Sequence, residues 1–219
     1  MYEWIDQTCN PIGGKCGHQC SYCYVGKGML TVQPKYRQAP FLDEKELGKS
    51  LGTGKLIFVC SMNDLWGKWI PNEWIDQVLE HCQRFDNTYL FQTKNPIRFT
   101  DFIIQFPHKA ILGTTIETNR DTSGRSQASP PKERLEVMYR ISLRGDKQTM
   151  VNIEPIMDFD LDVMVSWIER MKPTFVSIGA DSRRCNLPEP PPDKIKMLIR
   201  ELEKATEFRI KSNLARLVG

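Results

Sequence analysis

The sequence lacks three features that would assign it to a membrane, a secretory route or a strongly basic class. No apolar run approaches the roughly 18 residues of a membrane span. The first six residues lack the basic start and apolar core of a secretory signal. The formal charge of +3 at pH 7 is too small to indicate a nucleic-acid partner by itself. We therefore expect a cytoplasmic protein with no membrane partner, whose seven cysteines are thiols or metal ligands and not disulfides.

The cysteine spacing also lacks what a closed zinc site needs. Cys16, Cys20 and Cys23 lie in one Gly-rich loop, and no second Cys-x2-Cys pair follows. A structural zinc ion takes four ligands. A four-iron cluster held by three thiolates would instead leave one iron open, as a catalytic metal site requires. His18 or Cys9 could complete a zinc knuckle, so zinc remains the alternative.

This three-cysteine loop, with Tyr22 directly before its last cysteine, resembles the signature of the radical SAM superfamily. Trp4, Asn10-Pro11 and the small size are most similar to phage- and prophage-borne three-cysteine-motif members. The spore photoproduct lyase family is a more distant relative. The resemblance implies a 4Fe-4S cluster on the three cysteines, with S-adenosylmethionine (SAM) chelating the fourth iron. It implies that Tyr22 lies near the adenine.

The same resemblance implies the chemistry and its requirements. Reductive cleavage of SAM would yield a 5'-deoxyadenosyl radical that abstracts hydrogen from a substrate. The enzyme would be oxygen-sensitive and would need an electron donor such as flavodoxin or ferredoxin. Because 219 residues suit one sizeable core, we expect one domain over residues 1–219, with a cluster-binding loop at about 9–40.

Apolar runs alternate with amphipathic segments along the chain, which predicts a parallel sheet with helices outside. The number of strand and helix units, six or seven, is too small for the closed eightfold barrel, which typically takes ~250 residues. We therefore predict an α/β fold, a partial (β/α)6-type TIM-like barrel, as the resemblance also implies. The expected strands are 55–60, 88–93, 110–116, 150–153, 175–179 and 208–214, and the expected helices include 43–51, 132–143, 161–171 and 193–204.

Polar residues follow several of these strands, at the carboxyl ends where β/α enzymes build their sites. Ser61, Asn63 and Asp64 stand where the superfamily usually has a Gly-Gly-Glu-like stretch that binds the methionyl amino group of SAM. The chain departs from that pattern. An aspartate or asparagine can still accept from an ammonium group. A polar turn after a strand is the alternative.

Further candidates follow the next strands. The resemblance places Thr115 and Glu117 near the ribose and methionyl carboxylate of SAM, and Thr114 should face the opposite side of a regular strand. Lys94 could pair with the SAM carboxylate or a substrate anion, or be a solvated lysine. Glu154 is similarly placed as a cofactor-binding candidate.

Two cysteines are candidate hydrogen-atom donors. Cys60 begins a stretch that resembles the Cys-Thr-Ser-Asp stretch of spore photoproduct lyases, although this chain has one extra residue before the aspartate. A buried core cysteine is the alternative for Cys60. Cys185 is a rival donor. The neighbouring Arg183 and Arg184 could meet phosphate through charge-assisted hydrogen bonds, or simply be solvated.

The sequence thus favours a radical SAM enzyme, with a nucleotide or nucleic acid as the preferred substrate class. A radical SAM enzyme that acts on a peptide or small molecule is not separated from it, because no stretch specifies the substrate pocket. A zinc-stabilised nucleic-acid-binding module without catalysis is the alternative of a different class. It would bind through Lys35, Arg37, Arg183 and Arg184, with a steep salt dependence.

Overall fold

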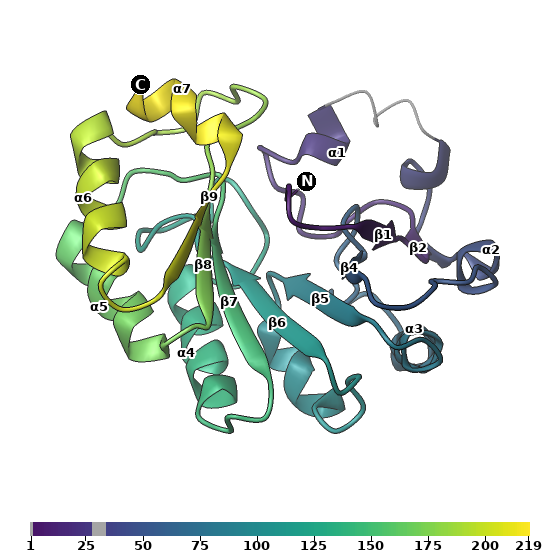
Figure 1. The fold of residues 1–219 in the computed structure, drawn as a ribbon. Helices are drawn as coiled ribbons and strands as arrows, with labels where there is room; N and C mark the ends of the chain where they lie inside the picture. The colour runs from purple at the N-terminus through teal and green to yellow at the C-terminus, as the bar shows by residue number, and fades with distance from the viewer. Residues whose placement is uncertain (1, 28–33) are drawn as a thin grey trace.

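The computed structural model describes residues 2–27 and 34–219, so residues 28–33 of the predicted cluster-binding loop lie outside the described residues. Seven parallel strands form one sheet whose spatial order follows the chain, β1-β4-β5-β6-β7-β8-β9. This confirms the predicted α/β fold with a parallel sheet and helices outside (Figure 1). The strands are β1 (Gln7–Cys9), β4 (Leu56–Val59), β5 (Thr88–Thr93), β6 (Ala110–Thr115), β7 (Gln148–Ile153), β8 (Phe175–Ile178) and β9 (Glu207–Ile210).

The helices cover the outer face of the curved sheet (Figure 1). Proline stands within the first two positions of α4 and α6, where its missing N–H costs no helical hydrogen bond. Asp43 caps α2, as its position predicts, by accepting from the backbone N–H groups of Lys45 and Glu46. The longer elements are α3 (Asn72–Gln83), η3 (Pro96–Phe102), α4 (Pro131–Ser142), α5 (Leu161–Met171) and α6 (Pro192–Leu202); short ones are α1 (Tyr24–Lys27), α2 (Glu44–Leu47), η2 (Pro34–Tyr36), η4 (Ser212–Leu214) and α7 (Ala215–Val218). None of the described helices is long and apolar enough to cross a membrane.

Alternating side chains of the strands build two apolar layers. The outer layer packs against the helices and includes Phe91 and Leu112. The inner layer fills the concave side of the sheet, where Leu90 and Met150 meet the N-terminal residues Tyr2 and Ile5. The N-terminal segment therefore supplies part of the core inside the partial barrel.

That N-terminal segment also reaches the last strand of the sheet. The ring of Trp4 stacks on Tyr2 with centroids 4.7 Å apart and meets Phe175 edge-on at 5.4 Å. The guanidinium of Arg209 lies over the Phe175 ring at 3.8 Å from its centroid. The same guanidinium lies 4.7 Å from the centroid of the Trp4 ring, so the N-terminal segment contacts β9, the last strand of the sheet.

Several elements differ from the prediction, among them α2, which ends at Leu47 and does not continue to residue 51. The first strand, β1, is not predicted because it has three residues, of which only Cys9 is buried. The last strand ends at Ile210, and Ser212–Leu214 forms a 3-10 turn in place of the predicted strand end. The segment after β5 forms a 3-10 helix, and the ring of its Phe99 meets that of Trp66 edge-on with centroids 4.9 Å apart.

Candidate active site

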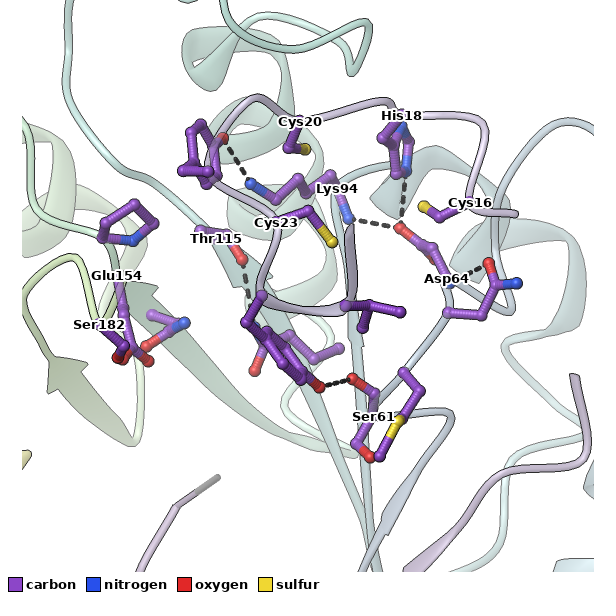
Figure 2. Close-up of a pocket in the computed structure, with 18 of the residues that line it drawn as sticks. Cys16, His18, Cys20, Cys23, Ser61, Asp64, Lys94, Thr115, Glu154 and Ser182 are labelled. Carbon is purple, nitrogen blue, oxygen red and sulfur yellow. Dashed lines mark hydrogen bonds and ion pairs between the residues drawn. The ribbon is translucent and has the colours of Figure 1, made fainter. Parts of the chain in front are cut away.

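A cavity of about 420 Å³ opens at the carboxyl ends of the strands, beneath the cysteine loop (Figure 2). Glu117 and Cys185 are the two predicted site residues that are not among its described lining. The other eleven line it: Cys16, Cys20, Tyr22, Cys23, Cys60, Ser61, Asn63, Asp64, Lys94, Thr115 and Glu154. Residues separated by more than 130 positions in the sequence therefore share one cavity.

Close backbone packing shapes the entry to the cysteine loop. Ile12–Gly13 (β2) pairs antiparallel with Phe41–Leu42 (β3). A Cβ on Gly13 would lie 2.3 Å from the Phe41 ring, and Gly14 has a left-handed φ of 86° with Ala39 O only 2.4 Å from an ideal Cβ. Glycine is required at Gly14, because of its backbone conformation and because a side chain would collide with backbone atoms, whereas a side chain at Gly13 would displace the Phe41 ring.

Asn63 and Asp64 brace this loop from the end of β4. The Asn63 amide donates to the backbone oxygens of Gly13 and Gly14 at 3.3 and 2.9 Å. Asp64 accepts from His18 Nε2 at 2.7 Å, and the two residues are only 7% and 5% exposed. Their polar atoms are thus already used to join the loop to the sheet.

Asp64 also ties the loop to β5. Its carboxylate accepts from the Thr93 hydroxyl at 2.8 and 2.9 Å, from the Lys94 backbone N–H at 2.9 Å and from the Trp66 N–H at 2.9 Å. The His18 ring meets Trp69 edge-on at 4.9 Å. This arrangement fixes His18 between the cysteine loop and the strand ends.

A second loop, between β6 and α4, is hydrogen-bonded to the cysteine loop on its other side. The backbone N–H of Ser21 donates to Arg125 O at 2.8 Å, and that of Gln127 donates to His18 O at 2.8 Å. Between these two bonds, Ser126 Oγ lies 3.2 Å from Cys20 Sγ. The cysteine loop is therefore held on one side by the side chains of Asn63 and Asp64 and on the other by backbone hydrogen bonds to residues 125 and 127.

The donor set of the loop suits a soft metal or an iron-sulfur cluster. Three thiols from one loop face one cavity, and burial raises the pKa of the Cys16 thiol to about 12, so that ligation must displace a proton. Within residues 2–27 and 34–219, no three His, Cys, Asp or Glu side chains already stand together in metal-binding geometry. The evidence that a cluster fits this site is therefore the three thiols and the single cavity that they line.

Behind the cavity wall, Glu117 is the centre of a buried ionic network. Arg134 Nη2 donates to Glu117 Oε2 at 2.8 Å, and both side chains are fully buried. Tyr22 donates to Glu117 Oε1 at 2.6 Å, and the Lys94 ammonium pairs with the same oxygen. Burial opposes ionisation of both Glu117 and Lys94. The charges of Arg134 and Lys94 nevertheless hold the pKa of Glu117 well below its usual range. In turn, the Glu117 carboxylate raises the pKa of Lys94 above its usual range.

This network places two cavity groups. The Lys94 ammonium donates to the Tyr22 hydroxyl at 2.7 Å and lies 4.5 Å from the Tyr22 ring centroid. Glu117 therefore orients Lys94 and Tyr22 at the cavity, although it does not line the cavity itself.

The strand ends beyond β6 bring further polar groups to the cavity. Thr115 lines it and accepts from the Gln92 amide at 3.1 Å, whereas Thr114 donates to Thr93 O. Thr114 and Thr115 therefore point to opposite sides of the strand, as predicted. Glu154 accepts from Lys211 Nζ at 2.8 and 2.7 Å and from Asn213 at 2.9 Å.

The two candidate donor cysteines occupy different surroundings. Cys60 is 4% exposed, lines the cavity and has a left-handed φ of 57°, which is uncommon outside glycine. Cys185 instead packs beside an apolar cluster that contains Tyr22 and Leu187. Arg183 lies exposed at the cavity mouth, and Arg184 is not part of the described lining.

The N-terminal part of the chain matches a known family. A model of the family described as "protein of unknown function (DUF5131)" matches residues 1–129, more than half of the chain. The chain belongs to the DUF5131 family. No curated protein matches it.

Solved structures share the fold of this DUF5131 chain at low sequence identity. A cysteine-to-serine mutant of spore photoproduct lyase has a TM-score of 0.65 at 11% identity, over 96% of this chain and 77% of that chain. A spore photoproduct lyase with bound AdoMet and dinucleoside spore photoproduct has a TM-score of 0.59 at 12% identity, over 90% and 61%. Streptococcus suis SuiB bound to S-adenosylmethionine has 0.56 at 9% identity, over 94% and 50%. The DUF5131 chain thus spans about half of SuiB and about three fifths of the liganded lyase.

Sequence reasoning on this DUF5131 chain missed several residues of the site. The sequence indicates His18 only as a possible zinc ligand, and Arg134, Ser126 and Tyr2 are not among the predicted residues, although Tyr2 lines the cavity and donates to Gln92 at 2.5 Å. A signal existed only for Arg134, an arginine on the apolar face of α4 beside Leu135 and Met138. An arginine in that place needs a buried partner.

Proposed function

We propose that this chain is a radical SAM enzyme, which binds a 4Fe-4S cluster through Cys16, Cys20 and Cys23. The observation that carries the proposal is that these three thiols line the same cavity at the carboxyl ends of a partial (β/α) barrel. Proteins with this fold have been solved with AdoMet or S-adenosylmethionine bound. When bound, the cluster and SAM would supply the reductive cleavage that yields a 5'-deoxyadenosyl radical.

The protein's own residues would bind SAM, orient it and keep water away from it. Ser61, Thr115 and Glu154 offer hydroxyl and carboxylate groups to the polar ends of SAM, with Tyr22 beside the adenine. Lys94 offers a cation for a carboxylate.

Three further residues lie at the end of β4. Asn63 and Asp64 act mainly by holding the cysteine loop, because their polar atoms are already engaged there. Cys60 is our preferred hydrogen-atom donor over Cys185, because only Cys60 lines the cavity.

For the substrate we propose a nucleotide or nucleic acid. Arg183 lies exposed at the cavity mouth with no side-chain partner among the described residues, which suits a phosphate. A solved spore photoproduct lyase of similar fold holds a dinucleoside spore photoproduct. A peptide is the second candidate, because SuiB of similar fold was solved with its precursor peptide SuiA. An electron donor such as flavodoxin or ferredoxin would be the redox partner.

The substrate proposal predicts that charge reversal weakens nucleic-acid binding. Arg183→Glu combined with Arg184→Glu should raise the Kd for a short single-stranded oligonucleotide at least tenfold, because two contacts to phosphate become repulsive. Fluorescence anisotropy at two salt concentrations measures this. Exposed Lys196→Glu with Arg200→Glu on α6 provides the same change of charge away from the cavity. Equal affinities of wild type and the Arg183/Arg184 variant would remove the basis for nucleic acid and favour the peptide.

The chemistry is tested by anaerobic reconstitution with iron and sulfide, followed by dithionite and SAM. We expect about four irons per chain and release of 5'-deoxyadenosine and methionine. The Cys16→Ala/Cys20→Ala/Cys23→Ala variant should lose both, whereas Cys82→Ala, which removes a thiol from α3, should keep both. One zinc per chain with no SAM cleavage would contradict the proposal and support the zinc-stabilised binding module.

A further inference from the structure

The loop between β6 and α4 brings one hydroxyl to a cysteine of the predicted cluster site. Ser126 is 6% exposed, and its Oγ lies 3.2 Å from Cys20 Sγ, although the two residues are 106 positions apart in the sequence. The other described contacts of Ser126 Oγ are with the Ala128 N–H at 3.1 Å and with His18 O at 3.5 Å. This hydroxyl is therefore buried among three polar atoms.

The hydrogen-bond roles of these atoms determine where the hydroxyl proton points. A serine hydroxyl has one proton to donate and two lone pairs. The Ala128 N–H can only donate, so it takes a lone pair of Ser126 Oγ. The proton is then available to Cys20 Sγ at 3.2 Å or to the more distant His18 O at 3.5 Å. A cysteine that ligates iron is a thiolate and can only accept, which makes Ser126 the donor to sulfur.

The backbone keeps Ser126 in this place. Arg125 O accepts from the Ser21 N–H, and the Gln127 N–H donates to His18 O, so a backbone bond stands on either side of the Ser126 contact. These two bonds also bracket Cys20 along its own loop.

We propose that Ser126 is a positioning residue that donates a hydrogen bond to the Cys20 sulfur and raises the reduction potential of the cluster held there. Hydrogen bonds to cysteine sulfurs stabilise the more negatively charged, reduced cluster and are one of the determinants of iron-sulfur potentials. This inference rests on the proposed function, since it requires a cluster on Cys20. The β6–α4 loop would then help to set the reduction potential of the cluster.

The test measures the potential of the reconstituted protein and not its activity. Ser126→Ala should shift the midpoint potential of the cluster to a more negative value, by about 59 mV for a tenfold change in the one-electron equilibrium. Ser126→Thr, which keeps the hydroxyl, should stay near wild type. Ser123→Ala, in the same loop but bonded to Asp121, should leave the potential unchanged. A redox titration monitored by electron paramagnetic resonance measures the midpoint potential of the wild type and of the three variants.

The outcomes separate this inference from the function on which it rests. A full cluster in Ser126→Ala with the wild-type potential would overturn the role of Ser126 and leave the radical SAM proposal intact. Zinc or no cluster in the wild type would overturn both. If Ser126→Ala fails to fold, Ser126→Gly takes its place in the same redox titration, and a wild-type potential in that variant overturns the role of Ser126.

Discussion

Arg134→Met is expected to lower the free energy of unfolding by about 3–5 kcal/mol, because it removes one partner of a fully buried ion pair. Glu117 would lose the donor to Oε2, and the backbone oxygen of Thr115 would lose its bond from the same guanidinium. Lys94 and Tyr22 would remain as partners of Oε1 only. Urea unfolding of the wild type and the variant measures the difference.

The chain offers a matched control on its surface. Arg170 also pairs with a glutamate, donating to the two carboxylate oxygens of Glu136 at 2.8 and 3.2 Å, but its side chain is 55% exposed. Arg170→Met should therefore cost only about 0–1 kcal/mol. Equal small losses for Arg134→Met and Arg170→Met would show that the buried network does not stabilise the fold.

The same network predicts how stability depends on pH. The folded-state pKa of Glu117 is lowered from 4.5, chiefly by Arg134 and then Lys94, against the effect of burial. The stabilisation is therefore present above pH 4.5 and is lost as the pH falls below it. Arg134→Met should reduce this loss, so the two stability curves should converge in acid.

The sequence predicts the central strands because each is a continuous apolar run, and it predicts the place of the site because parallel strands end at one edge. The first strand escapes prediction because Gln7–Cys9 pairs with only one neighbour and carries little apolar signal. The pairs that hold the cysteine loop also escape, since His18 and Asp64 are 46 positions apart and Cys20 and Ser126 are 106. Such pairs depend on tertiary contacts that no local pattern encodes.

Asp64, at the end of β4, contributes more to holding the site together than the polar turn predicted from the sequence would indicate. Each of its oxygens accepts a backbone N–H, from Trp66 at Oδ1 and from Lys94 at Oδ2. Asparagine has nearly the same shape, but one of its two positions is an NH2 group that donates. In Asp64→Asn, a donor must therefore face a backbone donor, whichever way the amide is turned.

We expect Asp64→Asn to lower the free energy of unfolding by about 2–3 kcal/mol, the cost of leaving a buried donor without an acceptor and weakening the neighbouring bonds. His18 would lose its carboxylate partner, so the cysteine loop would be less firmly held and the reconstituted protein should retain less iron after desalting. Asp162→Asn, at an exposed position in the first turn of α5, is the control for the chemical change alone. Full iron retention and wild-type stability in Asp64→Asn would mean that the loop is held by its backbone pairing with residues 125–127, and Ser126 would then be the next residue to vary.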